Sequence, residues 1–307
     1  MPSPKTASFR TSERAARRRV DGVLLLDKPA GLTSNAALQR AKRCFRAEKA
    51  GHTGTLDPLA SGLLPLCFGD ATKFAQSLLD ARKEYVATIR FGIATSTGDS
   101  EGETISEQPA DFTCADLDAA LPRFVGRIRQ VPPRHSALKH EGRAYYDYAR
   151  AGVEIPRAAR DVEVGAIEVV AFALPTATLR IECGKGTYIR VLAEDLGAAL
   201  GTCAHLAELR RTGSGAFRLE DAVSLVALEA LAPDARDALL LPVDAPLAAM
   251  PRIDVTMDDA DALVQGRSIA AGAGVAGRHR CYRGERFIGV VDVDGELVHP
   301  LRMARTD

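Results

Sequence analysis

A glycine-rich loop places one carboxylate in a position suited to catalysis. The loop Gly51–Gly62 reads GHTGTLDPLASG, with Asp57 between its glycines and Pro58 directly after it. Glycine permits unusual backbone angles and close approach of another chain, and proline keeps the preceding residue extended. The loop can therefore present the Asp57 carboxylate rigidly. Asp57 could also do no more than cap a turn before Pro58.

Other patterns that could carry chemistry are sparse. The six cysteines include no C-x-x-C pair and no neighbouring histidine cluster, so we expect reduced, mostly buried thiols and neither a zinc site nor a disulfide framework. A carboxylate in such a loop could also belong to a glycoside-type hydrolase, which acts at an anomeric carbon and normally needs two carboxylates. The acids nearest to Asp57 are Glu48 and Asp70, which form no paired pattern. Distant acids could still converge, so this alternative stays open.

Charge is balanced over the whole chain and uneven along it. There are 40 lysines and arginines against 40 aspartates and glutamates. Residues 1–20 carry six basic side chains and one acid, and residues 123–157 carry eight basic side chains and three acids. The stretch 96–118 has seven acids and no base. This distribution is compatible with one polyanion-binding face, although any single charge run can be an ordinary solvated surface.

The residues around the loop predict the elements that hold it. We expect a buried strand over residues 22–26 and a turn at 28–31. Ser34 can cap a helix whose apolar residues recur at helical spacing, and Asp70 can cap a second helix in the same way. Apolar and polar residues then alternate over 85–91, which predicts a strand.

The later elements follow the same kinds of signal. Thr113 and Asp116 are spaced as a capping box before an apolar helical stretch. Residues 177–183 alternate as a strand, and a helix is expected over 188–200. Strands and helices are interspersed without the regular repeat of a doubly wound sheet, so we expect an α+β fold with a mixed, largely antiparallel sheet.

Composition divides the chain into three parts. Residues 1–20 lack apolar periodicity and are interpreted as a basic flexible tail, and residues 21–248 as the main domain. The proline-containing stretch 246–254 is interpreted as a linker. The last part, residues 249–307, is rich in glycine and valine and predicts a small β-barrel-like module. Its strands are expected at residues 280–282, 287–293 and 296–299.

Five collinear motifs between residues 21 and 215 resemble those of one enzyme family. They are GVLLLDKP at 22–29, the Asp57 loop, KEY at 83–85, QVPP with SALK between 130 and 139, and GTYIR at 186–190 with LRRT at 209–212. Each motif is weak alone, and their order together is specific. The chain resembles the bacterial tRNA pseudouridine(55) synthases, the TruB family, which act on uridine 55 in the TΨC arm of tRNA. The last segment is similar, more loosely, to the PUA-like RNA-binding barrel of that family.

The resemblance assigns roles to Asp57 and its partners. It implies that Asp57 is the nucleophile, attacking either the uracil ring or the sugar C1′. Because burial alone opposes an ionised carboxylate, a positive partner is needed, and the resemblance makes Arg190 that partner. It implies that Tyr85 packs on the uracil and takes part in proton removal. Arg190 could otherwise be an ordinary surface arginine, and Tyr85 ordinary strand core.

Four further residues complete the implied site, and a fifth residue nearby departs from the family pattern. Tyr188 would line the pocket, and Leu209 would form an apolar wall against the base, although leucines in such runs are usually core. His52 would fill the space left when the target base flips out of the stacked loop. Lys28 would support the site without reacting. His135 stands where the family usually has Tyr or Phe, so we expect a different packing contact near the pocket.

The implied reaction breaks the N1–C1′ bond, turns the uracil and rejoins it through C5, with no net redox change. No cofactor and no metal are expected, in keeping with a sequence that lacks a dinucleotide fingerprint, a P-loop or a metal-ligand cluster. The implied partner is the TΨC stem-loop of tRNA. The basic block 123–157 also carries Tyr145, Tyr146 and Tyr148, a mixture suited to gripping an RNA backbone.

Two alternatives share the same fold. A non-catalytic RNA-binding protein would be favoured by loss of Asp57, Arg190 or Tyr85, and all three are present. A synthase of the same type could also act on a different RNA.

The apolar runs fall short of the roughly 18 residues needed to span a bilayer, and the N-terminus lacks a signal-peptide core. We therefore expect a cytoplasmic protein without a membrane partner. We also expect a monomer, an expectation that does not come from these runs.

Overall fold

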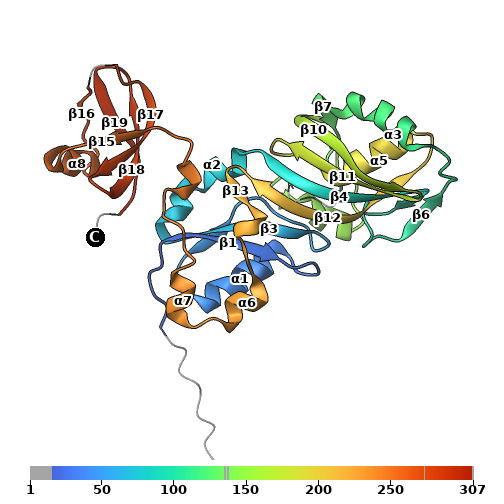
Figure 1. Ribbon diagram of the computed structural model, residues 1–307, viewed down its shortest axis with the longest axis horizontal. Helices are drawn as coiled ribbons and strands as arrows, with labels where there is room; N and C mark the ends of the chain where they lie inside the picture. Colours follow the sequence, from blue (N-terminus) through green and yellow to red (C-terminus); the bar gives the residue numbers. More distant parts are fainter. Residues whose placement is uncertain (1–15, 135, 137, 273, 306–307) are drawn as a thin grey trace, which may run out of the picture.

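The computed structural model describes residues 16–134, 136, 138–272 and 274–305 (Figure 1). Within these residues ten strands form one large sheet, whose main path runs β14-β1-β3-β12-β4-β11-β10-β7. The strands of this sheet are β1 (Gly22–Lys28), β2 (Ala50–His52), β3 (Ser61–Phe68), β4 (Lys83–Phe91), β7 (Gly126–Gln130), β10 (Arg160–Ala173), β11 (Thr176–Cys183), β12 (Ala204–Ser214), β13 (Phe217–Arg218) and β14 (Val223–Ser224). Only the β1–β14 and β3–β12 pairs are parallel among the described pairs of this sheet. The predicted mixed, largely antiparallel sheet is confirmed.

Short helices cover this sheet, and two small hairpins lie beside it. The helices are α1 (Ser34–Cys44), α2 (Ala75–Asp80), α3 (Cys114–Ala120), α4 (Tyr145–Arg150), α5 (Ile189–Ala199), α6 (Leu225–Ala230) and α7 (Pro233–Asp237), with 3-10 turns at Gly69–Phe74, Leu121–Phe124, Leu219–Asp221 and Ala245–Leu247. The hairpins are β5 (Ile93–Thr95) with β6 (Thr104–Glu107), and β8 (Lys139–His140) with β9 (Arg143–Ala144). No helix in the described ranges is both long and apolar enough to cross a bilayer.

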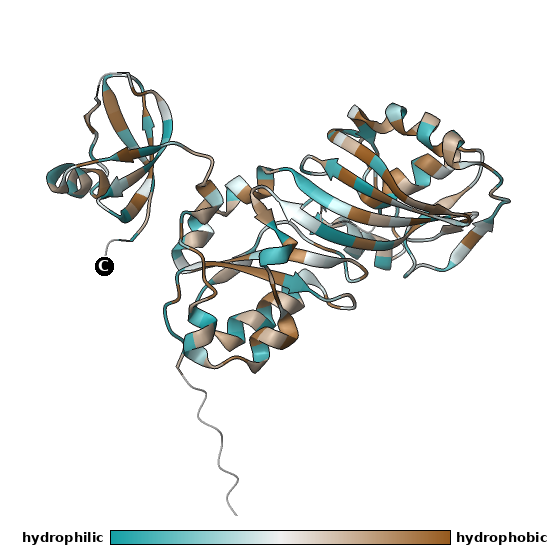
Figure 2. Cartoon of the chain, in the orientation of Figure 1, coloured by the Kyte–Doolittle hydropathy of each residue, from teal (hydrophilic) through white to brown (hydrophobic). Residues whose placement is uncertain are grey.

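Two hydrophobic cores meet where the candidate site lies. One core packs β4, β11 and β12 against α3 and α5, and the other packs β1 and β3 against α1 and α6. Figure 2 shows hydrophobic segments running along the strands, as burial of one sheet face requires. Tyr85 and Leu209 pack against both cores. These two side chains therefore stand at the junction of the two halves of the sheet.

Most of the predicted elements are present, and two predicted caps are wrong. The strands expected over 85–91 and 177–183, and the Thr113–Asp116 capping box, are confirmed. The cap of α1 is Thr33, whose Oγ1 accepts a hydrogen bond from Ala36 N over 3.0 Å. Ser34 instead uses its hydroxyl in a tertiary contact described below.

Asp70 does not cap the second helix. That helix begins with the 3-10 turn Gly69–Phe74, and no side chain caps it. The Asp70 carboxylate accepts a hydrogen bond from Arg305 N and lies 3.1 Å from Lys73 Nζ. A partner far along the chain therefore outcompetes the local cap.

The C-terminal segment forms a separate, curled five-stranded sheet with its own apolar core (Figure 1). Its elements are β15 (Arg252–Asp254), α8 (Met257–Val264), β16 (Ile269–Ala270), β17 (Gly277–Arg283), β18 (Arg286–Val293) and β19 (Leu297–Met303). The expected strands are confirmed, but the predicted linker 246–254 is too long, because β15 already pairs with β17. We call residues 252–305 the C-terminal module.

Apolar and polar contacts join the C-terminal module to the rest of the chain. The rings of Phe74 and Phe287 lie edge to face with centroids 5.2 Å apart. Asp244 accepts hydrogen bonds from Tyr282 and, over 3.0 Å, from Arg280. Of the predicted tail 1–20, residues 1–15 lie outside the described residues, as does His135. Residues 16–20 are described: Arg18 exchanges backbone hydrogen bonds with Arg46 and Glu48, and Val20 is buried, so the predicted tail extends too far.

Candidate active site

The Asp57 loop connects β2 to β3 and is tied to the elements around it. Ser34 Oγ donates to Leu56 O over 2.9 Å and accepts from Leu56 N over 2.7 Å. Ser34 therefore joins the first turn of α1 to the residue before Asp57. At the end of the loop Gly62 has φ +100°, and an added Cβ would lie 2.3 Å from Arg211 O. Only glycine fits at that point.

Asp57 forms an ion pair with Arg190 in the first turn of α5. Nη2 of Arg190 lies 3.0 Å from Oδ2 of Asp57. Only 7% of the Arg190 side chain is exposed, against 43% of the Asp57 side chain. The guanidinium is therefore inside the protein, while the carboxylate remains open to a substrate.

A second carboxylate, Asp99, lies against the same guanidinium. Nη1 of Arg190 lies 3.4 Å from Oδ2 of Asp99 and donates to Thr97 O over 3.1 Å. The Asp99 side chain is 4% exposed and accepts from Thr97 Oγ1 over 2.5 Å. Arg190 is thus held between a buried carboxylate and an accessible one, which fixes its position beside Asp57.

The surroundings of Asp57 have opposing effects on the pKa of its carboxyl group. Burial raises the pKa of Asp57, and the positive charge of Arg190 is the largest influence that lowers it. Asp99 raises the pKa further, and Lys28 lowers it. The net direction is upward, so Arg190 is the group that limits the rise and favours the ionised form.

Five of the predicted site residues line one cavity of about 460 Å³: Asp57, Tyr85, Tyr188, Leu209 and Arg190. Tyr85 comes from β4, Leu209 from β12, and Tyr188 precedes α5. Burial raises the pKa of Tyr85, and the neighbouring Arg211 lowers it. An aromatic ring, an apolar wall and a carboxylate therefore face one space, an arrangement suited to a flat heteroaromatic ligand. We call this space the base cavity.

His52 lines a second cavity, of about 550 Å³, which Asp57 and Arg190 also line. Burial lowers the pKa of His52, as does the charge of Arg211, and both favour the neutral ring. Its Nδ1 is buried and has no hydrogen-bond partner among the described residues. Asp57 thus stands between the base cavity and a second space that is large enough for a further group.

Lys28 lies behind the site and lines neither cavity. Its side chain is fully buried, and Nζ donates to Pro29 O over 2.9 Å and to Leu32 O over 2.6 Å. Burial lowers the pKa of Lys28 to about 8, although the charge of Asp57 opposes this shift. Lys28 therefore fixes the turn after β1 and adds positive charge near Asp57.

Three buried charged residues of the site carry no signal in the sequence that assigns them a role. Asp99 belongs to the acidic stretch 96–118, where nothing local distinguishes it from exposed acids. Lys83 and Arg211 both line the base cavity, and each stands two residues from a predicted site residue on its strand. Because alternate strand residues share a face, that spacing was the available signal.

The arrangement can supply an ionised carboxylate, a phenol and an apolar surface within one cleft. These groups suit nucleophilic attack and proton transfer on a bound ring. Within the described ranges, histidine, cysteine and carboxylate side chains form no group of three or more that could hold a metal ion.

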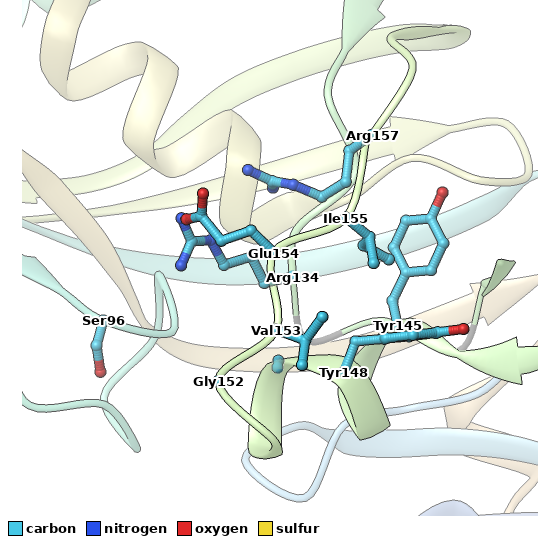
Figure 3. A pocket seen from close by; sticks show the side chains of 10 residues that line it. Ser96, Arg134, Tyr145, Tyr148, Gly152, Val153, Glu154, Ile155 and Arg157 are labelled. Carbon is cyan, nitrogen blue, oxygen red and sulfur yellow. The ribbon is translucent and has the colours of Figure 1, made fainter.

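A separate hollow of about 290 Å³ lies beside α4 and contains none of the predicted site residues. Figure 3 shows Arg134 alongside Glu154, with Arg157 nearby and the rings of Tyr145 and Tyr148 at the other end. Arg134 forms an ion pair with Glu154. Part of the basic block 123–157 is therefore neutralised within the protein.

Comparisons with known proteins place these features in a family. Residues 42–189 match the model of the "TruB family pseudouridylate synthase (N terminal domain)", and residues 190–248 match the "tRNA pseudouridylate synthase B C-terminal domain". The chain is 53% identical over 294 residues to "tRNA pseudouridine synthase B" of Thiobacillus denitrificans, covering 95% of this chain and 99% of that protein. It is 57% identical over 261 residues to the Ralstonia pickettii protein of the same name, covering 84% and 82%.

Chains from two solved complexes have the same fold. A chain of a Cbf5–Nop10–Gar1 complex matches with a TM-score of 0.71 and 27% identity, covering 92% of this chain and 84% of that one. A chain of an H/ACA RNP bound to a substrate RNA containing 2'-deoxyuridine matches with a TM-score of 0.69 and 25% identity, covering 93% and 85%. On the family models and the near full-length relatives, this chain belongs to the TruB family of pseudouridylate synthases.

Proposed function

We propose that this enzyme converts uridine to pseudouridine at position 55 in the TΨC loop of tRNA, with Asp57 as the nucleophile. The observation that carries the proposal is the ion pair between Asp57 and Arg190, both of which line the base cavity. The relatives named tRNA pseudouridine synthase B support tRNA as the substrate class. A tRNA substrate agrees with a cytoplasmic location.

The reaction requires that the target base leave its stack in the RNA. One cavity would hold the flipped base, and the other would lie beside the position that the base leaves. The flipped uracil would enter the base cavity, with Tyr85 on its face and Leu209 and Tyr188 as walls. His52, in the second cavity, would take the space that the base leaves. A neutral His52 can pack there without the cost of desolvating a charge.

The chemistry follows from the charge on Asp57. The N1–C1′ bond breaks, the uracil turns, C5 bonds to C1′, C5 loses its proton and N1 gains one, so no redox partner is needed. Attack by the carboxylate on the ring or on C1′ requires the ionised form in both cases. Arg190 maintains that form, and Asp99 and Lys28 hold Arg190 and the surrounding turn in place.

The remaining parts of the chain would bind RNA. We assign catalysis to residues 21–248 and RNA binding to residues 249–307, with a basic stretch at 1–20 and the enzyme acting as a monomer. Arg143 lies 4.8 Å from the centre of the Tyr148 ring, and Arg150 lies 5.5 Å from that of Tyr146. Such pairs of cation and ring suit contact with phosphates and unstacked bases.

The deciding experiment is tritium release from a tRNA transcript labelled at uridine C5, with wild type and Asp57→Asn compared. Release by wild type alone, mapped to the TΨC-loop uridine, is expected. Asp57→Asn keeps the shape of the side chain and removes the nucleophilic charge, so it should still bind tRNA. Normal release by Asp57→Asn would overturn the assignment of the nucleophile, and release at another uridine would overturn the assigned position.

A further inference from the structure

Arg211 is a buried cation that joins three parts of the site. Its side chain is 1% exposed, and in the sheet register it stands opposite Tyr85. Nε of Arg211 donates to Leu63 O over 2.7 Å, and Nη2 donates to Gly54 O over 3.1 Å. One guanidinium therefore connects β3, the Asp57 loop and the strand that carries Tyr85.

The guanidinium packs directly against the backbone of Gly54. Gly54 has φ +81°, and an added Cβ would lie 3.1 Å from Nη1 of Arg211. Gly54 is three residues before Asp57, whose carboxylate is held by Arg190. The Asp57 loop is thus fixed at two points by two different arginines, one on its backbone and one on its carboxylate.

The charge of Arg211 has no anionic partner in the described part of the chain. No carboxylate there forms an ion pair with Arg211, nor with Lys83, which is 6% exposed and also lines the base cavity. Lys83 Nζ donates to three backbone carbonyls, those of Leu78, Leu79 and Ala81. Burying unpaired charges costs stability, and an apolar side chain of similar size would avoid that cost.

We propose that Arg211 is a positioning residue of this reaction, which holds the Gly54 carbonyl and the Tyr85 phenol in a fixed relation to Asp57. The proposal rests on the proposed function, since it assigns Arg211 to that same site. Because Arg211 reaches the reacting atoms only through Gly54 and Tyr85, its removal should affect turnover more than substrate binding. Its positive charge also lowers the pKa of Tyr85, against the rise caused by burial.

The test uses two variants. Arg211→Met removes the positive charge and keeps a long side chain, and Arg211→Lys keeps the charge but loses the forked N–H donors of the guanidinium. For Arg211→Met we expect kcat on tRNA to fall about 100-fold with KM within about 3-fold, as for a small misplacement of catalytic groups. In Arg211→Met the pKa of Tyr85 should rise, because the charge that lowers it is gone. The part of the kcat–pH profile that follows the protonation of Tyr85 should therefore move to higher pH. Arg211→Lys should restore the position of that part of the profile and only part of kcat.

The matched control is the neighbouring Arg210. It points to the other side of β12, and its Nη2 lies 2.8 Å from Oδ2 of Asp27 at the surface. Arg210→Met should keep kcat within about 3-fold and leave the pH profile in place, since exposed ion pairs contribute little. A kcat near wild type for Arg211→Met would overturn the proposal. Equal loss of kcat and tRNA binding with a large drop in Tm for both Arg211 variants would also overturn it, in favour of a purely structural role.

A second measurement needs no substrate and separates this proposal from the proposed function. Hydrogen exchange of the amides in residues 51–62 should be faster in Arg211→Met than in Arg210→Met, because the loop loses one of the two arginines that hold it. If wild type releases no tritium from tRNA, the proposed function fails while this comparison still stands. Unchanged exchange across residues 51–62 would overturn the positioning role itself.

Discussion

Arg190 contacts the accessible carboxylate of Asp57 from inside the protein, with Nη2 3.0 Å from Oδ2 and only 7% of the arginine side chain exposed. This relationship lets the protein keep a charged carboxylate in a cleft that substrate would close to water. The charge on Asp57 therefore depends on Arg190, which lies 133 positions later in the chain.

The pH dependence of turnover should report this ion pair. The proposed mechanism requires ionised Asp57, and burial raises the pKa of this residue, so activity should be lost as pH falls through a value above the ordinary range for aspartate. Arg190→Gln removes the main influence that lowers this pKa, so the acidic limb of kcat should move to higher pH and kcat should fall. An acidic limb at the same pH in wild type and Arg190→Gln would contradict this account.

Stability should respond oppositely to loss of the two carboxylates beside Arg190. The folded-state pKa of Asp57 is raised, so its contribution to stability is present at low pH and is lost as pH rises through that pKa. At neutral pH the ionised Asp57 carboxylate is partly buried, which costs stability. Asp57→Asn removes that charge, so its Tm at neutral pH should be equal to or above that of wild type. A marked fall in Tm would show that the ion pair stabilises the fold.

Asp99→Asn is the matched change on the other side of Arg190. Asp99 is buried, so Asp99→Asn removes the charge of the buried carboxylate that faces the guanidinium, and breaking a buried ion pair is strongly destabilising. We expect a lower Tm, by on the order of 5 °C, a reduced kcat, and an acidic limb at lower pH, because Asp99 no longer raises the pKa of Asp57. Thermal unfolding and kcat measured on the same preparations test this, and an unchanged Tm would show that Arg190 keeps its place without the Asp99 charge.

The salt dependence of tRNA binding should locate the RNA-binding face. Arg129, Arg143 and Arg150 are exposed members of the basic block 123–157, and their combined change to glutamine should flatten the slope of log Kd against log salt by about 1 per lost phosphate contact. The control changes Arg90 and Arg180 to glutamine. Both are exposed on the sheet face opposite α5, so the slope should stay as in wild type. Equal slopes for the two variants would remove the block from the interface.

Attachment of the C-terminal module should depend on Asp244. This residue is 8% exposed and accepts hydrogen bonds from Arg280 and Tyr282 across the boundary of the module. Asp244→Ala should weaken the attachment by about 1–3 kcal/mol, the usual cost of leaving buried polar groups unsatisfied, because Arg280 and Tyr282 lose their shared acceptor. Hydrogen exchange should increase in β17 near Arg280 and Tyr282 while β4 keeps its protection. A uniform increase would mean that the change destabilises the whole chain.

The sequence alone was enough for features that depend on neighbours in the chain. The alternation at residues 85–91 and 177–183 comes from burial of one strand face, and the Thr113–Asp116 capping box closes within four residues. The glycines around Asp57 likewise record a local requirement for unusual backbone angles. Motif order then indicated the family, and the comparisons show that family.

Only the tertiary structure decided which charged groups meet. Asp99 looks like any other acid of its stretch until β5 and α5 bring it to Arg190, and Ser34 looks like a helix cap until Leu56 takes its hydroxyl. Asp70 binds the backbone of Arg305 for the same reason. A buried polar group is satisfied by whichever partner the packing brings within about 3 Å, and sequence spacing does not encode that distance.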